Sequence, residues 1–285
     1  MANKPSTIRG LIGAAERELT AGPHTERARK DAELLLLHLL GKDHAWLMAH
    51  LMDEFSGDLI QRYGELLLQR FNGEPIQYIL GESEFYGLPF GVTLDVLIPR
   101  PETEHLVEKV IELAAGFPAP SIVDVGTGSG CIAVALVHHL PDAAITAIDL
   151  SAAALAVAEQ NAKRNGVDLH FLQGDLLAPV ANEQFDIIVS NPPYVPTADR
   201  DSLAVEVRDH EPALALFAGD DGLDIYRRLI PQAFACLFPC GFIAIEIGYG
   251  QSEAIGELLA SAGFRQIEFI PDLQSIPRVA VAQRP

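Results

Sequence analysis

Four consecutive residues, Asn191-Pro192-Pro193-Tyr194, combine fixed hydrogen-bond acceptors with an aromatic ring. Neither proline has a backbone N–H, and Pro193 restricts Pro192 to an extended conformation, so the stretch presents its carbonyl oxygens in fixed directions. The Asn191 side chain adds an amide acceptor, and the Tyr194 ring adds a flat wall. Acceptors beside an aromatic face suit a planar –NH₂ group. The competing interpretation is a proline-rich turn.

A glycine-rich segment, DVGTGSGC at residues 124–131, follows a short apolar run and precedes a helical pattern. Its glycines allow the backbone to approach a ligand closely, and the N-terminus of the next helix offers unpaired N–H groups. A dinucleotide fingerprint needs a glycine at position 131, where the chain has Cys131. NAD or FAD is therefore a weaker interpretation, and the Gly-Lys-Ser/Thr of a phosphate-binding loop does not follow.

Two acidic residues stand at the ends of the next two predicted strands. Asp149 lies 19 residues after Gly130, where a carboxylate in a doubly wound sheet accepts hydrogen bonds from the ribose hydroxyls of an adenosine. Asp175 follows the third strand, where it suits a contact to an adenine amino group. Each residue has an ordinary structural alternative, a helix N-cap for Asp149 and a turn residue for Asp175.

The elements that position these residues alternate between strand and helix from Pro120 onward. We expect strands at 121–125, 144–149, 169–172, 185–190, 242–247, 265–270 and 278–282, and helices at 132–140, 151–163, 224–238 and 252–262. This α/β alternation predicts a mostly parallel, doubly wound sheet with helices on both faces. In that topology the fourth strand lies beside the first, so NPPY faces the glycine loop across the ligand-binding crevice.

The chain before this region divides into two further parts. Residues 1–75 carry three apolar stripes at helical spacing, which predict a small N-terminal helical bundle with the stripes as its core. Residues 76–95 are rich in β-branched and aromatic residues and are interrupted by glycines, which predicts a β-hairpin connector or an extended one. Residues 96–285 then form the α/β domain.

Composition excludes several classes of protein. The 285 residues include 20 Lys and Arg against 39 Asp and Glu, a formal net charge of −19, which argues against a broad phosphate-tracking surface. Three Cys cannot form a disulfide framework, and the nine His show no metal-ligand spacing. The longest apolar runs are too short to cross a membrane, and the N-terminus lacks a secretory h-region. We therefore expect a cytoplasmic enzyme or acidic binding module without a metal.

The segments DVGTGSG and NPPY, together with Asp149, resemble class I S-adenosylmethionine-dependent methyltransferases that modify planar amino or amide nitrogens. The stretch QYILGESEFYGLPFGVTLDVLIPRPETE, residues 77–104, narrows the resemblance to the release factor glutamine methyltransferases, the PrmC/HemK family. The related ribosomal-protein glutamine methyltransferases share NPPY but differ at LIPRPETE. The resemblance covers nearly the whole chain, and like that family the chain places a helical domain before a catalytic one.

The resemblance implies a Rossmann-like methyltransferase domain at residues 96–285 and a substrate-recognition domain at residues 1–75. It implies transfer of a methyl group from S-adenosyl-L-methionine, leaving S-adenosyl-L-homocysteine, to the glutamine N5 of the Gly-Gly-Gln motif in class-1 peptide chain release factors. The protein partner is then a release factor, with no direct nucleic acid, no membrane and no metal. The implied cofactor-binding residues are Gly126, Thr127, Gly128, Ser129, Gly130, Asp149, Asp175, Leu176 and Asn191. The implied catalytic residues are Asn191, Pro192 and Tyr194, and the implied substrate-binding residues are Asn191, Pro192, Pro193 and Tyr194.

The predicted mechanism depends on orientation, because an amide nitrogen is a poor nucleophile and the sequence shows no strong base. The Asn191 side chain and the Pro192 carbonyl would each accept one amide N–H, which aims the nitrogen at the methyl group. Positive charge develops on the nitrogen as the methyl moves, so fixed acceptors stabilise the transition state more than the ground state.

The chain departs from the family's sequence pattern at two places, and two alternative functions stay open. Leu176 stands where family members often have an aromatic residue, and DLQSIPRV at residues 272–279 receives no role. N6-adenine DNA or guanine RNA methyltransferases use a similar pocket, but they would carry a basic target-recognition region. Residues 1–95 instead contain nine Lys and Arg against fourteen Asp and Glu, which favours a protein substrate. A non-enzymatic binding module would keep the fold without the chemistry.

Overall fold

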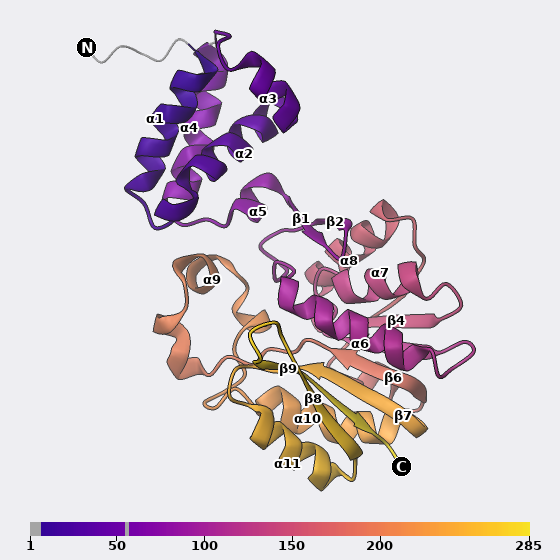
Figure 1. The fold of residues 1–285 in the computed structure, drawn as a ribbon. Coiled ribbons are helices and arrows are strands. Elements are labelled where there is room, and N and C mark those ends of the chain that lie inside the picture. The colour runs from indigo at the N-terminus through magenta and orange to yellow at the C-terminus, as the bar shows by residue number, and fades with distance from the viewer. Residues whose placement is uncertain (1–6, 55–56) are drawn as a thin grey trace. The chain divides into compact units, whose positions relative to one another are not determined.

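The protein is described by a computed structural model that covers residues 7–54 and 57–285 (Figure 1). These residues belong to two compact units. The helical unit consists of the chain as far as Gly81 together with Ala204–His210, and the α/β unit consists of Glu82–Leu203 and Glu211–Pro285. Within the described ranges, no helix combines the length and the apolar character needed to cross a bilayer.

The helical unit buries the three predicted stripes. Its helices are α1 (Ile8–Thr20), α2 (Ala28–Leu40), α3 (His44–His50), α4 (Gly57–Phe71), α5 (Ile76–Leu80) and α9 (Val205–His210). Thr7 begins α1 by accepting a hydrogen bond from the Gly10 N–H at 3.2 Å. Gly41 ends α2 in the left-handed conformation, with φ +60°. The core contains Ile12, Leu35, Leu36 and Tyr63, all at most 1% exposed.

A buried ion-pair cluster holds α9 within the helical unit. Arg70 of α4 and Asp31 of α2 are 1% and 0% exposed, and the Arg70 Nε donates to Asp31 Oδ2 at 2.7 Å. The Arg70 Nη1 also donates to the Glu206 carboxylate of α9. Nearby, a Cβ on Gly73 would lie only 2.8 Å from Cγ1 of Val205. The sequence pattern of residues 1–75 could not reveal helix α9, because it lies more than 120 residues further along the chain.

The predicted connector differs from the observed structure. Residues 76–80 form helix α5, with Ile76 and Tyr78 buried, and Gly81 at φ +72° ends it. The hairpin itself is shorter than 76–95: β1 (Glu82–Phe85) pairs antiparallel with β2 (Leu88–Gly91). A short apolar run that ends in glycine is compatible with a buried helical turn as well as with a strand. The sequence pattern therefore predicted the wrong structure for residues 76–80.

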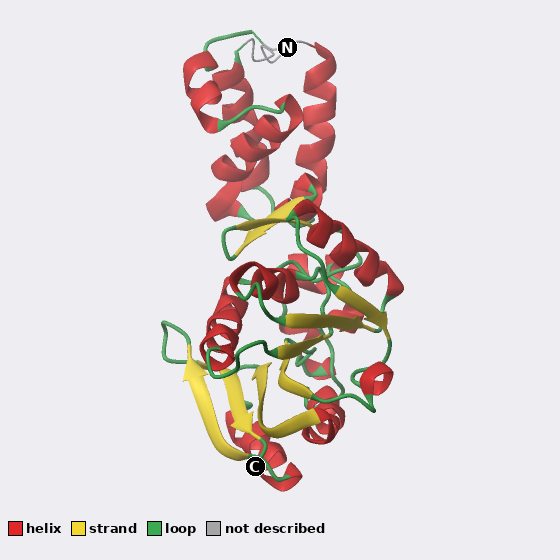
Figure 2. Ribbon diagram, turned by 90° about the vertical axis from the view of Figure 1, so that its right-hand side faces the viewer, coloured by secondary structure: helices red, strands yellow, loops and turns green. Residues whose placement is uncertain are grey.

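The α/β unit contains a seven-stranded sheet in the order β5-β4-β3-β6-β7-β9-β8 (Figures 1 and 2). The strands are β3 (Ser121–Val125), β4 (Ala144–Asp149), β5 (His170–Gln173), β6 (Phe185–Ser190), β7 (Leu237–Glu246), β8 (Arg265–Pro271) and β9 (Pro277–Gln283). Strands β3 to β7 are parallel, whereas β9 runs antiparallel to both of its neighbours, β7 and β8, at one edge of the sheet. This confirms the predicted mostly parallel sheet and the pairing of the first strand with the fourth.

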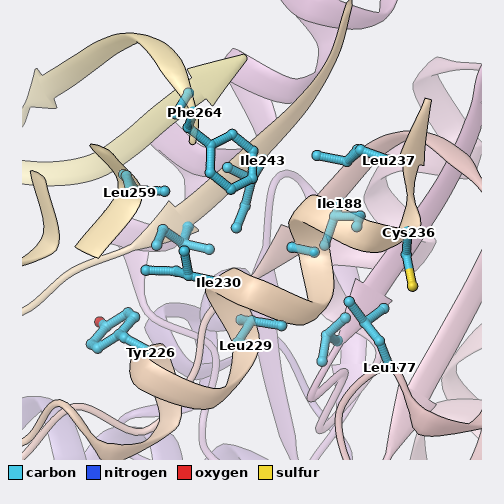
Figure 3. Close-up of a cluster of buried hydrophobic side chains, with 14 of the residues drawn as sticks. Leu177, Ile188, Tyr226, Leu229, Ile230, Cys236, Leu237, Ile243, Leu259 and Phe264 are labelled. Atoms are coloured by element: carbon cyan, nitrogen blue, oxygen red, sulfur yellow. The ribbon is translucent and has the colours of Figure 1, made fainter. Parts of the chain in front are cut away.

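Helices cover both faces of the sheet, as predicted (Figure 1). They are α6 (Glu104–Ala114), α7 (Cys131–His139) and α8 (Ala152–Arg164) on one face, and α10 (Asp224–Cys236) and α11 (Ser252–Ala262) on the other. Because side chains alternate along a strand, Ile187 of β6 packs toward the first group and Ile188 toward the second (Figure 3). Helix α10 ends at Cys236 rather than at the predicted Phe238, since Pro239 disfavours helical geometry at the preceding residue.

Candidate active site

The carboxyl ends of neighbouring parallel strands bring the predicted residues to one pocket. Asp124 of β3 pairs in register with Ala147 of β4 and Val189 of β6, so the loops after these strands meet at one edge. They surround a pocket of about 370 Å³. The predicted site residues that line it are Gly126, Thr127, Gly128, Ser129, Asp149, Asp175, Leu176, Asn191, Pro192 and Pro193.

Two predicted residues, Gly130 and Tyr194, do not line this pocket. Gly130 has φ +80°, and a Cβ there would lie 3.0 Å from the Ala158 Cβ of α8, so its role is close packing of α7 and α8. The Tyr194 hydroxyl instead lies 3.4 Å from Glu246 Oε1, and its backbone oxygen accepts a hydrogen bond from Gln251 Nε2 at 3.0 Å. The expectation that the Tyr194 ring forms a wall of the pocket is therefore corrected.

The glycine loop is fixed by its own hydrogen bonds. The Gly126 and Thr127 N–H groups donate to the Ile148 carbonyl at 2.8 and 2.9 Å, and the Gly130 N–H donates to the Thr127 carbonyl at 2.8 Å. These three N–H groups, which precede helix α7, are therefore already bonded within the protein, and the adjacent strand β4 accepts two of them. What the loop offers a ligand is close backbone approach, at Gly126 and at Gly128.

A buried carboxylate beneath the loop was not predicted. Asp124 is 0% exposed and accepts a hydrogen bond from the Thr127 hydroxyl at 2.6 Å. Burial raises the pKa of Asp124 to about 7, an effect that the Thr127 bond opposes and the nearby Asp149 charge reinforces. Its place at the end of β3, before the first glycine, is the signal that could have identified it.

Asp149 is held by backbone groups on both of its oxygens. Oδ2 accepts the Gly128 N–H and Oδ1 accepts the Ser151 N–H, each at 2.8 Å. Ser151, not Asp149, caps α8, since its hydroxyl oxygen accepts the Ala154 N–H at 3.2 Å. The N-cap alternative for Asp149 is therefore wrong. Each carboxylate oxygen keeps a second lone pair, and burial raises the pKa of Asp149 despite these bonds.

The residues after β5 give the pocket an exposed, charged margin. The Asp175 carboxylate forms an ion pair with Arg228 of α10, and both side chains are about half exposed. Leu176 is half-buried and lies in the left-handed region at φ +52°. Asp175 therefore has a basic partner within the pocket lining, and Leu176 contributes apolar surface to that lining.

Asn191 and Thr103 both line the pocket, and they begin a hydrogen-bonded chain that ends at the buried Glu246. The Asn191 Nδ2 donates to the Thr103 Oγ1 at 3.0 Å, and the Thr103 hydroxyl donates to Glu246 Oε2 at 2.6 Å. Thr103 and Glu246 are each 2% exposed. Burial raises the pKa of Glu246 to about 7, while the bond from Thr103 opposes the rise. Glu246 ends β7 as Asp149 ends β4, so the same sequence signal could have identified it.

Comparison with known proteins identifies the family. The chain is 42% identical over 280 residues to the release factor glutamine methyltransferase of Koribacter versatilis, covering 98% of this chain and 99% of that protein. It is 41% identical to the Geobacter sulfurreducens relative of the same name, over 98% of each chain. The chain belongs to the release factor glutamine methyltransferase family. It is therefore an enzyme, a methyltransferase, and the resemblance carried by NPPY and LIPRPETE is confirmed.

Domain families and solved structures agree with this assignment. Residues 11–81 match the PrmC N-terminal domain, and residues 103–208 match the Methyltransferase small domain. The hMettl16 catalytic domain is 19% identical with a TM-score of 0.57, covering 81% of this chain and 82% of that one. A methyltransferase from Pyrococcus furiosus is 17% identical with a TM-score of 0.52, covering 70% and 90%. These structures confirm the Rossmann-like methyltransferase fold of this release factor glutamine methyltransferase family member.

Proposed function

We propose that this enzyme transfers a methyl group from S-adenosyl-L-methionine to the side-chain N5 of the Gly-Gly-Gln glutamine in class-1 peptide chain release factors. One observation carries the proposal: the Asn191 and Pro192 acceptors line the same pocket as the glycine loop and Asp149. The relatives that match over the full chain are named for methylation of release factor glutamine.

The pocket residues fit the proposed cofactor. Asp149 keeps lone pairs that can accept from ribose hydroxyls, and the exposed backbone at Gly126 permits close approach. Apolar lining from Leu150, Leu176 and Ile225 suits a purine ring. When bound, S-adenosylmethionine supplies an electrophilic methyl group on a cationic sulfonium, which acidic surroundings favour.

The protein's own residues orient the substrate amide. Because the Asn191 Nδ2 is taken by Thr103, its Oδ1 is the atom left to accept a hydrogen bond. Pro192 is buried and has no N–H, so it can serve only as an acceptor through its carbonyl. Two such acceptors would hold both N–H bonds of a primary amide and direct the nitrogen lone pair toward the methyl group.

The substrate class is tested by parallel methylation assays. A release factor, duplex DNA and RNA are each incubated with the enzyme and S-adenosylmethionine, and products are analysed by mass spectrometry. We expect one added methyl group on the Gly-Gly-Gln glutamine, with the helical unit contributing recognition of the release factor. Methylation of nucleic acid alone would overturn the proposal in favour of the nucleic-acid alternative.

We expect Asp149→Ala to weaken binding of S-adenosylmethionine at least tenfold. Hydrogen bonds to a charged group contribute on the order of 1.5–3 kcal/mol each, and the variant also releases the Gly128 N–H that shapes the loop. Isothermal titration calorimetry measures the affinity. Asp142→Ala, at an exposed aspartate before β4, is the matched control. Unchanged affinity in a folded Asp149→Ala protein would remove Asp149 from the cofactor site.

A further inference from the structure

The side chains of Asn191, Thr103 and Glu246 form one hydrogen-bonded relay from the pocket into the protein interior. We propose that Thr103 and Glu246 are positioning residues that hold the Asn191 amide with its oxygen toward the substrate. This inference rests on the proposed function, since it concerns how Asn191 receives the substrate amide. It assigns to both residues a role that they perform through Asn191 rather than on the reacting nitrogen.

The direction of the relay follows from the number of donors and acceptors. An ionised carboxylate can only accept, so the one hydroxyl proton of Thr103 points to Glu246 Oε2. The Thr103 oxygen then has only lone pairs for Asn191, which must present its NH₂ group at 3.0 Å. A flipped Asn191 would place its oxygen against lone pairs of Thr103. The ionised Glu246 therefore selects one of the two amide orientations.

Protonation of Glu246 would reverse this selection. A neutral Glu246 carboxyl can donate to the Thr103 oxygen, which frees the Thr103 proton to point toward Asn191 and favours the flipped amide. The Tyr194 hydroxyl also approaches Glu246 Oε1, at 3.4 Å, while the Tyr226 hydroxyl donates to the Glu246 backbone carbonyl at 2.8 Å. The titratable and charged groups that face Glu246 are Glu102, Cys131, Tyr194, Tyr226 and Arg278.

The first test removes the Thr103 hydroxyl. Thr103→Val keeps the side-chain shape, and we expect the single-turnover rate of release factor methylation to fall by roughly tenfold to a hundredfold. Thr103→Ser restores the hydroxyl and should recover most of that loss. Affinity for S-adenosylmethionine should stay the same in both variants, because the relay acts on the substrate amide.

The second test asks whether Thr103 acts through Asn191. In an Asn191→Ala background, Thr103→Val should cause little further loss of rate, because the side chain that it positions is already absent. A purely structural contribution of Thr103 would instead lower the rate by the same factor in both backgrounds. Tyr226→Phe is the matched control, since it removes a buried hydroxyl bonded to the Glu246 main chain rather than to its carboxylate.

The third test is a pH profile of Glu246→Gln. The Gln oxygen can still accept from Thr103, but it does not titrate. Since the pKa of Glu246 is raised to about 7, the carboxylate fraction falls roughly tenfold between pH 8 and pH 6. We expect the ratio of wild-type to Glu246→Gln rates to fall by a similar factor over that range. A ratio that does not change with pH would overturn the role of Glu246.

These outcomes separate the relay from the proposed function. If wild-type enzyme leaves the release factor unmethylated, the proposed function fails. If wild-type enzyme methylates it and Thr103→Val is equally fast with a native circular dichroism spectrum, the relay is wrong while the proposed function stands. A rate loss that Thr103→Ser does not recover would also overturn the relay.

Discussion

Replacing Asn191 with alanine should lower the single-turnover rate of methyl transfer to a release factor by roughly 10²–10³, as when one preorganised hydrogen-bond partner is removed from a reacting centre. Asn191 lies after β6 in the pocket lining and is only partly buried, so the fold should tolerate the change. Affinity for S-adenosylmethionine should change little, because the proposed role of the Asn191 side chain is to receive the substrate amide. Single-turnover measurements separate the chemical step from slow product release.

The Asn191→Asp variant tests whether an acceptor oxygen at position 191 is sufficient, or whether the hydrogen bond to Thr103 must also hold that oxygen in place. Aspartate keeps an oxygen for the substrate but loses the NH₂ group that Thr103 accepts, and it adds a negative charge beside the cationic cofactor. That charge would favour the ground state, whose positive sulfonium is neutralised as the methyl leaves. The methyl-transfer rate of Asn191→Asp should therefore stay below that of the wild-type enzyme. Asn182→Ala, at an exposed asparagine of the same unit, controls for nonspecific effects. Transfer at the wild-type rate by Asn191→Ala would leave the proline carbonyls as the remaining acceptors.

Arg70→Met should destabilise the helical unit by about 3–5 kcal/mol, because it leaves the Asp31 carboxylate buried without its main partner. Methionine keeps much of the volume of Arg70, so the loss of stability measures the effect of the missing charge rather than of a cavity. The protein has a single tryptophan, Trp46, in α3 of this unit. Trp46 fluorescence during urea unfolding therefore follows the stability of the helical unit.

Two further variants control this measurement. Arg29 also pairs with acidic side chains, but it is more than half exposed, and Arg29→Ala should change the stability by only about 0–1 kcal/mol. Adding Asp31→Asn to Arg70→Met removes the buried charge and should recover much of the lost stability. If the double variant is no more stable than Arg70→Met alone, packing rather than charge explains the effect of Arg70.

The sheet could be predicted from the sequence because each parallel strand is a short apolar run that ends at or before a glycine, an acidic residue or, for β6, Asn191. Strand β6, for example, occupies the predicted range, and its pairing with β3 followed from topology rules. Helix α3 escaped prediction because its seven residues present little periodicity, although Asp43 caps it. Helix α5 was mistaken for strand because a five-residue apolar run suits either structure.

The pocket could also be predicted, except for the contacts that cross between distant segments. Asn191, Asp149 and the glycine loop follow strands, so their positions at the sheet edge were evident from order alone. Thr103 and Glu246 meet across 143 residues, and no local pattern couples them. Gly130 and Tyr194 belong to recognised motifs, yet motif membership does not show whether a residue faces a ligand or a neighbouring helix.

The position of α9 limits where this chain can be divided. A gene fragment ending at residue 81 would encode Arg70 without Glu206, and a fragment starting at residue 82 would encode α9 without the Gly73 surface that accommodates Val205. A chimera that exchanges the helical unit between two relatives must therefore exchange two coding segments, residues up to 81 and residues 204–210. Because the second segment begins ten residues after Tyr194, one junction of such a graft lies ten residues after the NPPY motif in the sequence.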